Sequence, residues 1–560
     1  MKTLHYLAIL GLVFVSLVHS SCIHDELEIA PEFEDLVDDD PHDGEHRMLA
    51  ASYASIRILV DYTHLKAPST AVRNYIMNTL MPPAVKYFSH SIQVQRVSKL
   101  KFSAKTACSL AIPSKYRTTG VAADLILFVT GVSTTENYVA WAKPCIQLAS
   151  NKRPIVGQVN LNFRDIQTSK YFGFHQDITT IMHEITHVLG FSKSLYSSWP
   201  SKPIYKTKVV NGNTISYISA NPLTQTVRDH FGCKTAVGAY LENQGASGSI
   251  GSHFERRVFF NEFMTASEIK DARITKFTLA LLASTGWYKV VYDWAEPTYW
   301  GYLDGCAFLD TKCVNPSTKR TAFSEFCTTF NAYGCYASGT WGGFCGNTKI
   351  SKAKTLDADI NYFGDKRVVL DPYADNCPFI TPYSNMNCED SANQKSAVFS
   401  GEAYGYGSKC FMGTLYSKKA LSTQRPYCFK YDCIKQSNGR YALNVKIGSK
   451  TAVCTAAGDK KVTGYAGVLK CPDPQTYCTT IGKKYCKRGC MGNGKCLSTG
   501  LCQCNSGWTG ADCSMKTSTQ SKIMKEPVVE EPYGDESVIE NGEDSYDASP
   551  EEYNNNEDEN

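Results

Sequence analysis

The 560-residue sequence has only one apolar stretch that approaches the length of a membrane-spanning helix, Leu4 to Val18. Every later hydrophobic run is short, which excludes a protein with several membrane spans. Acceptable Asn-X-Ser/Thr sites are also missing, because Asn315-Pro-Ser317 has proline in the middle, so N-glycosylation is not expected. With 43% hydrophobic and 20% charged residues, the composition excludes full-length disorder and a collagen-like fibre, and the length suits several domains.

The first twenty residues have the layout of a cleaved signal peptide. Lys2 precedes the apolar stretch, and the small residues Ser20 and Ser21 follow it. The C-terminal residues are polar, so we do not expect a lipid anchor. The 23 cysteines are dense after Cys306 and indicate an oxidising compartment. We therefore predict a signal peptide over 1–20, secretion, and no transmembrane segment in the mature chain.

The net charge of +4 conceals an uneven distribution of acidic and basic residues. Residues 22–47 hold 11 acidic residues and one basic residue, and residues 526–560 hold 14 acidic residues and none that is basic. Residues 51–525 retain 56 basic against 29 acidic residues. We expect an acidic pro-segment over 21–50, a disordered acidic tail over 514–560, and a basic body that attracts an anionic surface or matrix. Specific nucleic-acid binding is not expected, since no binding motif accompanies the charge.

The segment from Asp177 to Gly190, with the sequence DITTIMHEITHVLG, predicts a metal site on a buried helix. Asp177 suits an N-cap and Gly190 a helix end. Between them the apolar residues recur at helical spacing: Ile178, Ile181, Met182, Ile185, Val188 and Leu189. His183 and His187 are four residues apart, so both imidazoles project from one face and can share a zinc ion. Glu184 is placed to take a proton from water at the metal.

A catalytic zinc ion usually has three protein ligands, so the sequence must supply one more. In zincins with the longer HExxHxxGxxH signature, a histidine follows the glycine by three residues. Lys193 occupies that position here and cannot coordinate, because its ammonium group has no lone pair. The downstream candidates for the third ligand are His230 and His253.

With this interrupted zinc motif the chain resembles the leishmanolysin-type metzincin peptidases. Members of that family interrupt the long zinc motif with an inserted segment and resume it with histidine, an aromatic residue and glutamate. Gly251-Ser-His-Phe-Glu255 looks like that resumption, so the resemblance implies that His253 is the third ligand of one zinc ion per chain. It also implies an insertion over 191–252, in which His230 is structural. Asn261-Glu-Phe-Met-Thr-Ala266 looks like the tight turn of metzincins beneath the metal, with Met264 as its methionine.

The resemblance implies a secreted zinc endopeptidase of the α+β class that hydrolyses protein or peptide substrates, pairing their backbone with an edge strand. Its zincin-like catalytic lobe would comprise an N-terminal subdomain over 51–190, the insertion, and residues 253–300. A Cys-rich, loop-rich domain is expected over 301–480. From the residues themselves we expect three strands, at Ile56–Asp61, Leu125–Thr130 and Ile155–Leu161. We also expect one further helix over 265–285.

Six closely spaced cysteines near the C-terminus resemble an EGF-like module over 486–513. They are Cys486, Cys490, Cys496, Cys502, Cys504 and Cys513. The resemblance implies the pairs 486–496, 490–502 and 504–513. A zinc cluster is the alternative, but no histidine is present there and six thiols exceed one tetrahedral site. Such a module suggests docking to a surface or substrate.

Cys22 is left over when the other cysteines are counted. Residues 108–478 hold 16 cysteines, sufficient for eight bridges. The segment around Cys22 resembles the family's pro-region motif, which implies a cysteine switch whose thiolate blocks the metal in a zymogen. A merely unpaired or intermolecular cysteine is the alternative.

Two other functions stay open from the sequence. A secreted adhesion protein would use the EGF-like module and the basic body, but would not require Glu184. A different zinc hydrolase, such as an amidase, could use the same metal ligands.

Overall fold

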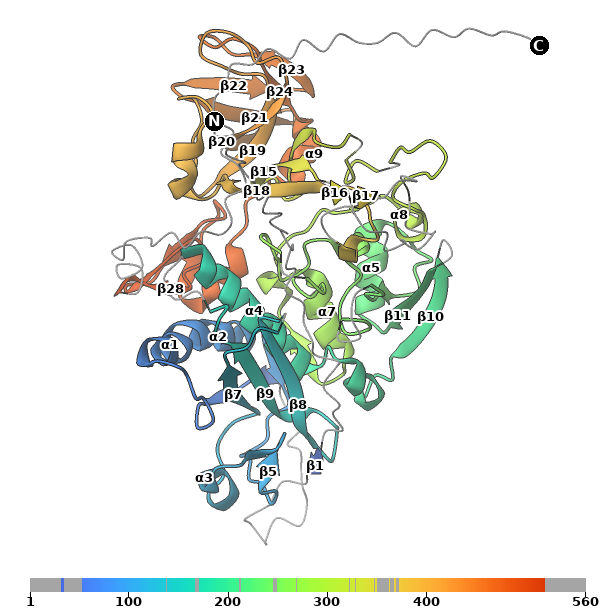
Figure 1. Cartoon of the computed structure of the whole chain (residues 1–560), viewed down its shortest axis with the longest axis vertical. Helices are drawn as coiled ribbons and strands as arrows, with labels where there is room; N and C mark the ends of the chain where they lie inside the picture. The colour runs from blue at the N-terminus through green and yellow to red at the C-terminus, as the bar shows by residue number, and fades with distance from the viewer. Residues whose placement is uncertain are drawn as a thin grey trace, which may run out of the picture. The chain divides into compact units, whose positions relative to one another are not determined.

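The computed structural model in Figure 1 describes most of the chain. The described residues are 32–34, 53–136, 138–166, 171–210, 213–244, 249–267, 269–321, 323–327, 329–346, 348–349, 362, 367–368 and 372–518. The predicted signal peptide, Cys22 and most of the predicted acidic tail lie outside them. Within the described part of the chain, no helix is both long enough and apolar enough to cross a membrane.

A five-stranded mixed sheet forms the base of the N-terminal lobe, in the order β1-β8-β9-β7-β3. The strands are β1 (Glu32–Glu34), β3 (Ile58–Asp61), β7 (Leu125–Val132), β8 (Ala140–Leu148) and β9 (Pro154–Asn162). β3, β7 and β9 are parallel, and they correspond to the three strands expected from the sequence. β8 runs antiparallel to β9, while β1, from the predicted pro-segment, pairs with β8 in parallel. Every residue of β9 is buried, including the polar Gln158, Asn160 and Asn162 that alternate with Val159 and Leu161.

The helix α4 (Tyr171–Leu189) packs on β8 and β9 and carries the predicted metal motif (Figure 1). Gly157 of β9 permits a close approach, because a Cβ atom there would lie 2.3 Å from Val188 Cγ1. The helix α2 (Met81–Ser91) packs against α4, preceded by α1 (Thr70–Tyr75) and a π-helical turn. These contacts bury the apolar face that the helical periodicity predicted.

Two expectations about helix boundaries are wrong. α4 begins at Tyr171, so Asp177 is not its N-cap. Asp177 is instead buried within the helix, where its Oδ2 accepts a hydrogen bond of 3.1 Å from the Tyr75 hydroxyl. The helix expected over 265–285 is restricted to α7 (Lys276–Ser284), because Thr275 caps it by accepting a hydrogen bond from Phe277 N.

The segment predicted as an insertion contributes to the main core rather than forming a separate one. It contains an antiparallel sheet and a helix: β10 (Ile204–Val210), β11 (Asn213–Ser219), β12 (Ala239–Tyr240) and α5 (Leu223–Phe231). Phe231 of α5 stacks with Phe277 of α7 at a ring-centroid distance of 6.1 Å. α5 and α7 pack against each other, which connects this segment to the catalytic lobe.

The Cys-rich region contains more sheet than the loop-rich domain expected from its composition. A six-stranded antiparallel sheet has the order β22-β21-β20-β19-β24-β23. Its strands are β19 (Ser408–Gly413), β20 (Arg425–Lys435), β21 (Tyr441–Ile447), β22 (Lys450–Cys454), β23 (Gly458–Lys461) and β24 (Val468–Cys471). A smaller sheet comprises β14 (Tyr333–Cys335), β15 (Trp341–Cys345) and β18 (Ile380–Asn387). The glycine, tyrosine and cysteine content of this region suggested loops, but its backbone pairs in antiparallel strands instead.

The remaining elements are short. The strands are β2 (Ala54–Ser55), β4 (Ile92–Val94), β5 (Thr106–Ala107), β6 (Leu110–Ala111), β13 (Tyr288–Val290), β16 (Thr348–Lys349), β17 (Arg367–Val368), β25 (Gly494–Cys496), β26 (Cys502–Cys504), β27 (Trp508–Thr509) and β28 (Met515–Lys516). The α-helices are α3 (Ser114–Thr118), α6 (Arg256–Phe259), α8 (Cys306–Asp310) and α9 (Pro474–Thr479). The 3₁₀ segments are η3 (Lys193–Ser198), η4 (Tyr292–Trp294), η5 (Pro372–Ala374), η6 (Ser391–Ser396) and η7 (Lys487–Gly492).

Eleven disulfides connect all the cysteines from 108 onward. Eight of them use the 16 cysteines of residues 108–478: 108–145, 233–306, 313–377, 327–345, 335–410, 388–428, 433–478 and 454–471. The other three are 486–496, 490–502 and 504–513, the same pairs that the EGF-like resemblance implied.

Candidate metal centre and cleft

The structure brings His183, His187 and His253 together in the interior of the lobe. The Nε2 atoms of His183 and His187 are 3.0 Å apart, and those of His183 and His253 are 3.2 Å apart. His187 and His253 are fully buried, whereas 9% of the His183 surface is exposed. Two Zn–N bonds of tetrahedral geometry place their nitrogens roughly 3.3 Å apart. The three nitrogens therefore have the spacing of a zinc ligand set.

Each of the three imidazoles is oriented by a backbone carbonyl at its other nitrogen. Nδ1 of His183 lies 2.7 Å from Phe263 O, and Nδ1 of His187 lies 2.6 Å from Phe191 O. Nδ1 of His253 lies 2.9 Å from the carbonyl oxygen of residue 249. Because a carbonyl only accepts, each Nδ1 carries the proton, and each Nε2 directs a lone pair toward the shared centre.

These three nitrogens fit a zinc ion, whereas hydrogen bonds among the three imidazoles do not account for their positions. Three Nε2 lone pairs in mutual proximity cannot hydrogen-bond to one another, so a cation at their centre is the natural partner. Burial lowers the pKa of His183 to about 4, even though the hydrogen bond to Phe263 acts in the opposite direction. The imidazole is thus neutral at physiological pH, which is the form that coordinates a metal.

The segment around Met264 links two of the three histidines. Phe263 supplies the carbonyl that orients His183, and Met264 O accepts a hydrogen bond of 2.9 Å from the backbone N–H of Phe254, next to His253. Met264 is fully buried in the main core. The backbone N–H of Met264 donates to Glu262, whose carboxylate also accepts from the hydroxyl of Thr278 at 2.6 Å. Glu262 therefore connects this turn to α7.

Gly190 follows the end of α4, three residues after His187. Its φ of +157° and the contact of 3.0 Å that a Cβ atom would make with Thr285 Cγ2 both favour glycine. The turn that follows brings the carbonyl of Phe191 back to His187. The glycine thus helps to orient the His187 imidazole as well as ending the helix.

The other predicted residues lie in different places. His230 is not part of the triad; its Nε2 hydrogen-bonds to Trp300 O at 2.8 Å, in keeping with the structural role expected for it. The sulfurs of Cys486, Cys490 and Cys502 lie close enough to resemble a metal cluster, but all three belong to disulfides and have no thiolate to offer. Cys22 lies outside the described residues, so its contact with the metal stays a prediction.

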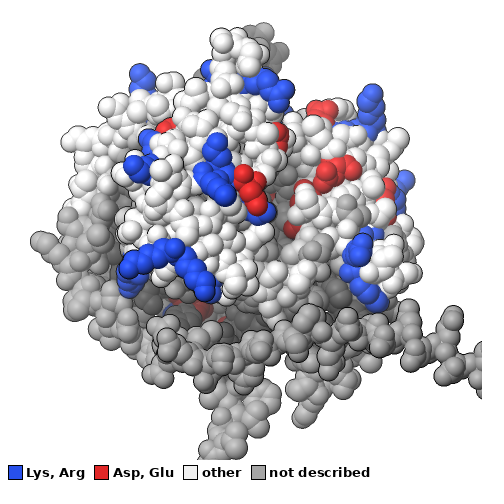
Figure 2. All heavy atoms as spheres, turned by 90° about the horizontal axis from the view of Figure 1, so that it is seen from above, with Lys and Arg blue, Asp and Glu red and all other residues white. Residues whose placement is uncertain are grey.

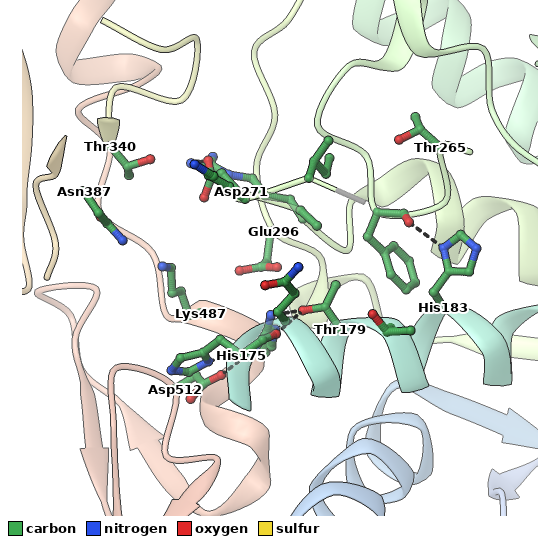
Figure 3. Close-up of a pocket in the computed structure, with 18 of the residues that line it drawn as sticks. His175, Thr179, His183, Thr265, Asp271, Glu296, Thr340, Asn387, Lys487 and Asp512 are labelled. Carbon is green, nitrogen blue, oxygen red and sulfur yellow. Dashed lines mark hydrogen bonds and ion pairs between the residues drawn. The ribbon is translucent and has the colours of Figure 1, made fainter. Parts of the chain in front are cut away.

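A cavity of about 340 Å³ extends from the metal centre along the N-terminal half of α4. Figure 3 shows His183 at one end, His175 and Thr179 along the same helix, and Lys487 and Asp512 at the opposite end. Glu184 lines the cavity and is 2% exposed. Other lining residues come from the Cys-rich region and the EGF-like module, including Thr340, Asn387, Glu389, Lys487, Arg488 and Asp512.

Sequence reasoning missed most of this cleft. His175, Thr179, His183 and His187 recur every four residues, so a longer helix would have placed them on one face, and that pattern was available. The residues from the Cys-rich region and the EGF-like module leave no such local signal, because they reach the cavity only through the tertiary fold.

A helix bearing HExxH, a third histidine from a distant segment, and a buried methionine turn that links them define a protein of the metzincin class of metal-dependent peptidases. The leishmanolysin (peptidase M8) family model matches residues 29–494, and an EGF-like domain model matches residues 486–513. The chain belongs to the leishmanolysin family.

Its similarity to individual relatives is moderate. It is 31% identical to a leishmanolysin homolog of Crithidia fasciculata over 350 residues, covering 61% of this chain and 52% of the relative. The identity to leishmanolysin of Leishmania major is 26% over 443 residues, covering 77% and 71%. A leishmanolysin-like peptidase of Drosophila melanogaster is 26% identical, with 64% and 63% covered. The aligned part thus spans about half the length of the Crithidia relative.

Proposed function

We propose that this chain is a secreted zinc-dependent endopeptidase that is made as a zymogen. The observation that carries the proposal is the convergence of three carbonyl-oriented imidazoles beside Glu184 in a cleft. Membership in the leishmanolysin family and the names of the relatives support protein or peptide substrates. Many disulfides and an EGF-like module are consistent with an extracellular location.

His183, His187 and His253 would hold the zinc ion, which would supply a Lewis acid that polarises the scissile carbonyl and lowers the pKa of water. Glu184 follows His183 on α4 and borders the same cavity. Its carboxylate takes the proton from the attacking water and then donates that proton to the leaving amine. Glu184, His187 and His253 are buried, and the low dielectric around them strengthens their interactions with charges that form during the reaction.

The edge of β8 provides a surface on which an extended substrate can lie. Val139 and Ala140, at the start of this strand, line the cavity. β9 pairs with one edge of β8, and among the described strands β1 reaches only Ile146–Leu148 of the other. A substrate strand could therefore form backbone hydrogen bonds with the part of β8 nearest the metal centre.

The test compares activity with zinc content in two variants. Glu184→Gln removes the base but preserves its shape, so we expect casein hydrolysis to fall by about 10²- to 10⁴-fold with one zinc ion per chain retained. His253→Ala should lose both the zinc and the activity. Full activity of Glu184→Gln would overturn the proposal. Cleavage of small amides without cleavage of casein would favour an amidase instead.

The basic body gives limited support to the adhesion alternative. On the face shown in Figure 2, lysine and arginine side chains lie in several separate groups, with acidic side chains beside some of them. Retention on an anionic matrix at low salt, compared with and without residues 526–560, would measure this attraction. Binding to a matrix without any peptide hydrolysis by the zinc-loaded protein would support adhesion as the function.

A further inference from the structure

The segment that opens the EGF-like module has an uncommon backbone conformation. Arg488, Gly489, Cys490 and Met491 are consecutive residues with φ between +47° and +57°. Three of the four are not glycine, and a left-handed helical backbone is unfavourable for an L-residue because its Cβ crowds the following carbonyl oxygen. Such a conformation persists only where surrounding contacts impose it.

The left-handed turn packs the module against the catalytic lobe. Met491 is fully buried and belongs to the main apolar core of the lobe. Gly489 lies against Trp294, where a Cβ atom would approach the indole ring to 2.5 Å. Asn493 accepts a hydrogen bond from Lys86 of α2. The module is therefore integrated into the lobe on this side rather than attached by its ends alone.

Arg488 connects this turn to the active-site helix. Its guanidinium group donates to Thr179 Oγ1 at 2.6 Å and to Asp512 Oδ2 at 2.9 Å, and lies 3.5 Å from His175 Nδ1. Arg488 is 8% exposed and Asp512 is 1% exposed, so the ion pair between them is shielded from water. Thr179 is one helical turn before His183, the first metal ligand.

The same segment closes one end of the cavity. Figure 3 shows Lys487 projecting into the cavity opposite His183, with Asp512 beside His175. Lys487 is held from the other side by Glu389 of the Cys-rich region at 2.8 Å. The eight residues from His175 to His183 span about 12 Å of helix, a distance that an extended peptide covers in about four residues.

We propose that the EGF-like module forms a wall of the substrate cleft, and that Arg488 is a positioning residue that fixes this wall against α4 for substrates long enough to reach it. The proposal rests on the proposed peptidase function. A short peptide that occupies only the metal end of the cleft would not contact the wall. A polypeptide that extends about four residues or more toward the N-terminal end of α4 would.

The experiment uses two quenched fluorescent peptides built around one bond that the activated full-length protein cleaves in casein. The short peptide has two residues on each side of the bond, and the long peptide has six. Arg488→Ala removes the charge-assisted hydrogen bond that holds the wall against α4. The long peptide should then bind more weakly, and its kcat/KM should fall about tenfold, mainly through a higher KM. The short peptide should change less than about twofold, and zinc content should not change.

Matched variants separate positioning from general destabilisation. Thr179→Val keeps the shape of the acceptor side chain and should reproduce part of the loss on the long peptide, and Arg488→Lys should restore part of it. Lys495→Ala, at an exposed position of the same module, should leave both peptides unaffected. The proposal would be overturned if Arg488→Ala lowered kcat/KM equally for both peptides. It would also be overturned if neither Arg488→Ala nor Thr179→Val lowered kcat/KM for the long peptide. Failure of the activated, zinc-loaded protein without these substitutions to cleave casein would overturn the proposed function itself.

Discussion

Residues 53–300 and residues 313–513 achieve their stability by different means. The first region contains one complete disulfide, 108–145, and most of the largest apolar core. The second contains nine of the eleven disulfides. There the cystines are themselves core material: one buried cluster combines Cys388, Cys410 and Cys428 with a single tyrosine, Tyr404.

The two regions also line different sides of the cleft. The three histidines and Glu184 all come from the region stabilised by packing. The opposite wall, with Asn387, Glu389 and Lys487, comes from the region stabilised by cross-links. Perturbing packing should therefore affect the metal centre first, whereas removing a cross-link should affect the wall first.

The largest effect on stability is expected from removing a cross-link beside the cleft. Cys388 and Cys428 are fully buried, and Cys388 lies between two residues that line the cavity. Replacing both with Ala should lower the free energy of unfolding by about 4 kcal/mol, because the closed loop of some 40 residues no longer restricts the unfolded chain. Chemical denaturation measures this, and zinc analysis of the folded variant should still find one ion. Loss of zinc from the folded variant would contradict the comparison.

A smaller effect on stability is expected from overpacking the contact between β9 and α4. Gly157→Ala places a methyl group against the side chain of Val188, which adjoins His187, so this side chain and the part of α4 that carries it must shift. The free energy of unfolding should fall by about 1–3 kcal/mol, and zinc affinity should fall with it. Adding Val188→Ala makes room for the methyl group and should restore much of the zinc affinity. Unchanged zinc affinity in Gly157→Ala would show that the helix position does not control the metal centre.

The smallest effect concerns His230 in the segment between the two parts of the zinc motif. Burial lowers its pKa to about 4 from an unfolded value of 6.5, although the hydrogen bond to Trp300 acts in the opposite direction. The unfolded state therefore binds the proton first, so stability is retained above pH 6.5 and falls as the pH drops toward 4. His230→Gln preserves a hydrogen-bond donor for the carbonyl oxygen of Trp300 but does not titrate. Between pH 6.5 and 5.5 its free energy of unfolding should therefore fall by about 1 kcal/mol less than that of the wild type. Urea unfolding at saturating zinc at both pH values checks this; parallel profiles would contradict it.

Local sequence signals predicted the parts of the fold that local rules determine. The spacing of His183 and His187 placed both on one face of a helix, and apolar runs identified β3, β7 and β9. The N-terminal end of α4 could not be fixed in this way, because Asp177 has a side chain suited to capping yet is held inside the helix by Tyr75. A tertiary contact outweighed a local preference there.

Residues that meet across long stretches of chain could not be found by spacing. His253 joined the ligand set only through the family resemblance, since its separation from His187 depends on how residues 191–252 fold. The same holds for Arg488, which lies more than 300 residues from Thr179 along the chain. The EGF-like cysteines suggested an independent docking module, and nothing in their spacing indicated contact with the active-site helix.

The main-chain acceptors that orient the three imidazoles have a consequence for how the site tolerates change. No side-chain replacement at Phe191, Ser249 or Phe263 can delete a carbonyl oxygen, so the protonation pattern of the ligands is encoded in the path of the backbone. Such a site is insensitive to the identity of its immediate neighbours and sensitive to anything that displaces the loops carrying them. Sequences that have diverged widely around these positions can therefore retain the same affinity for the ion.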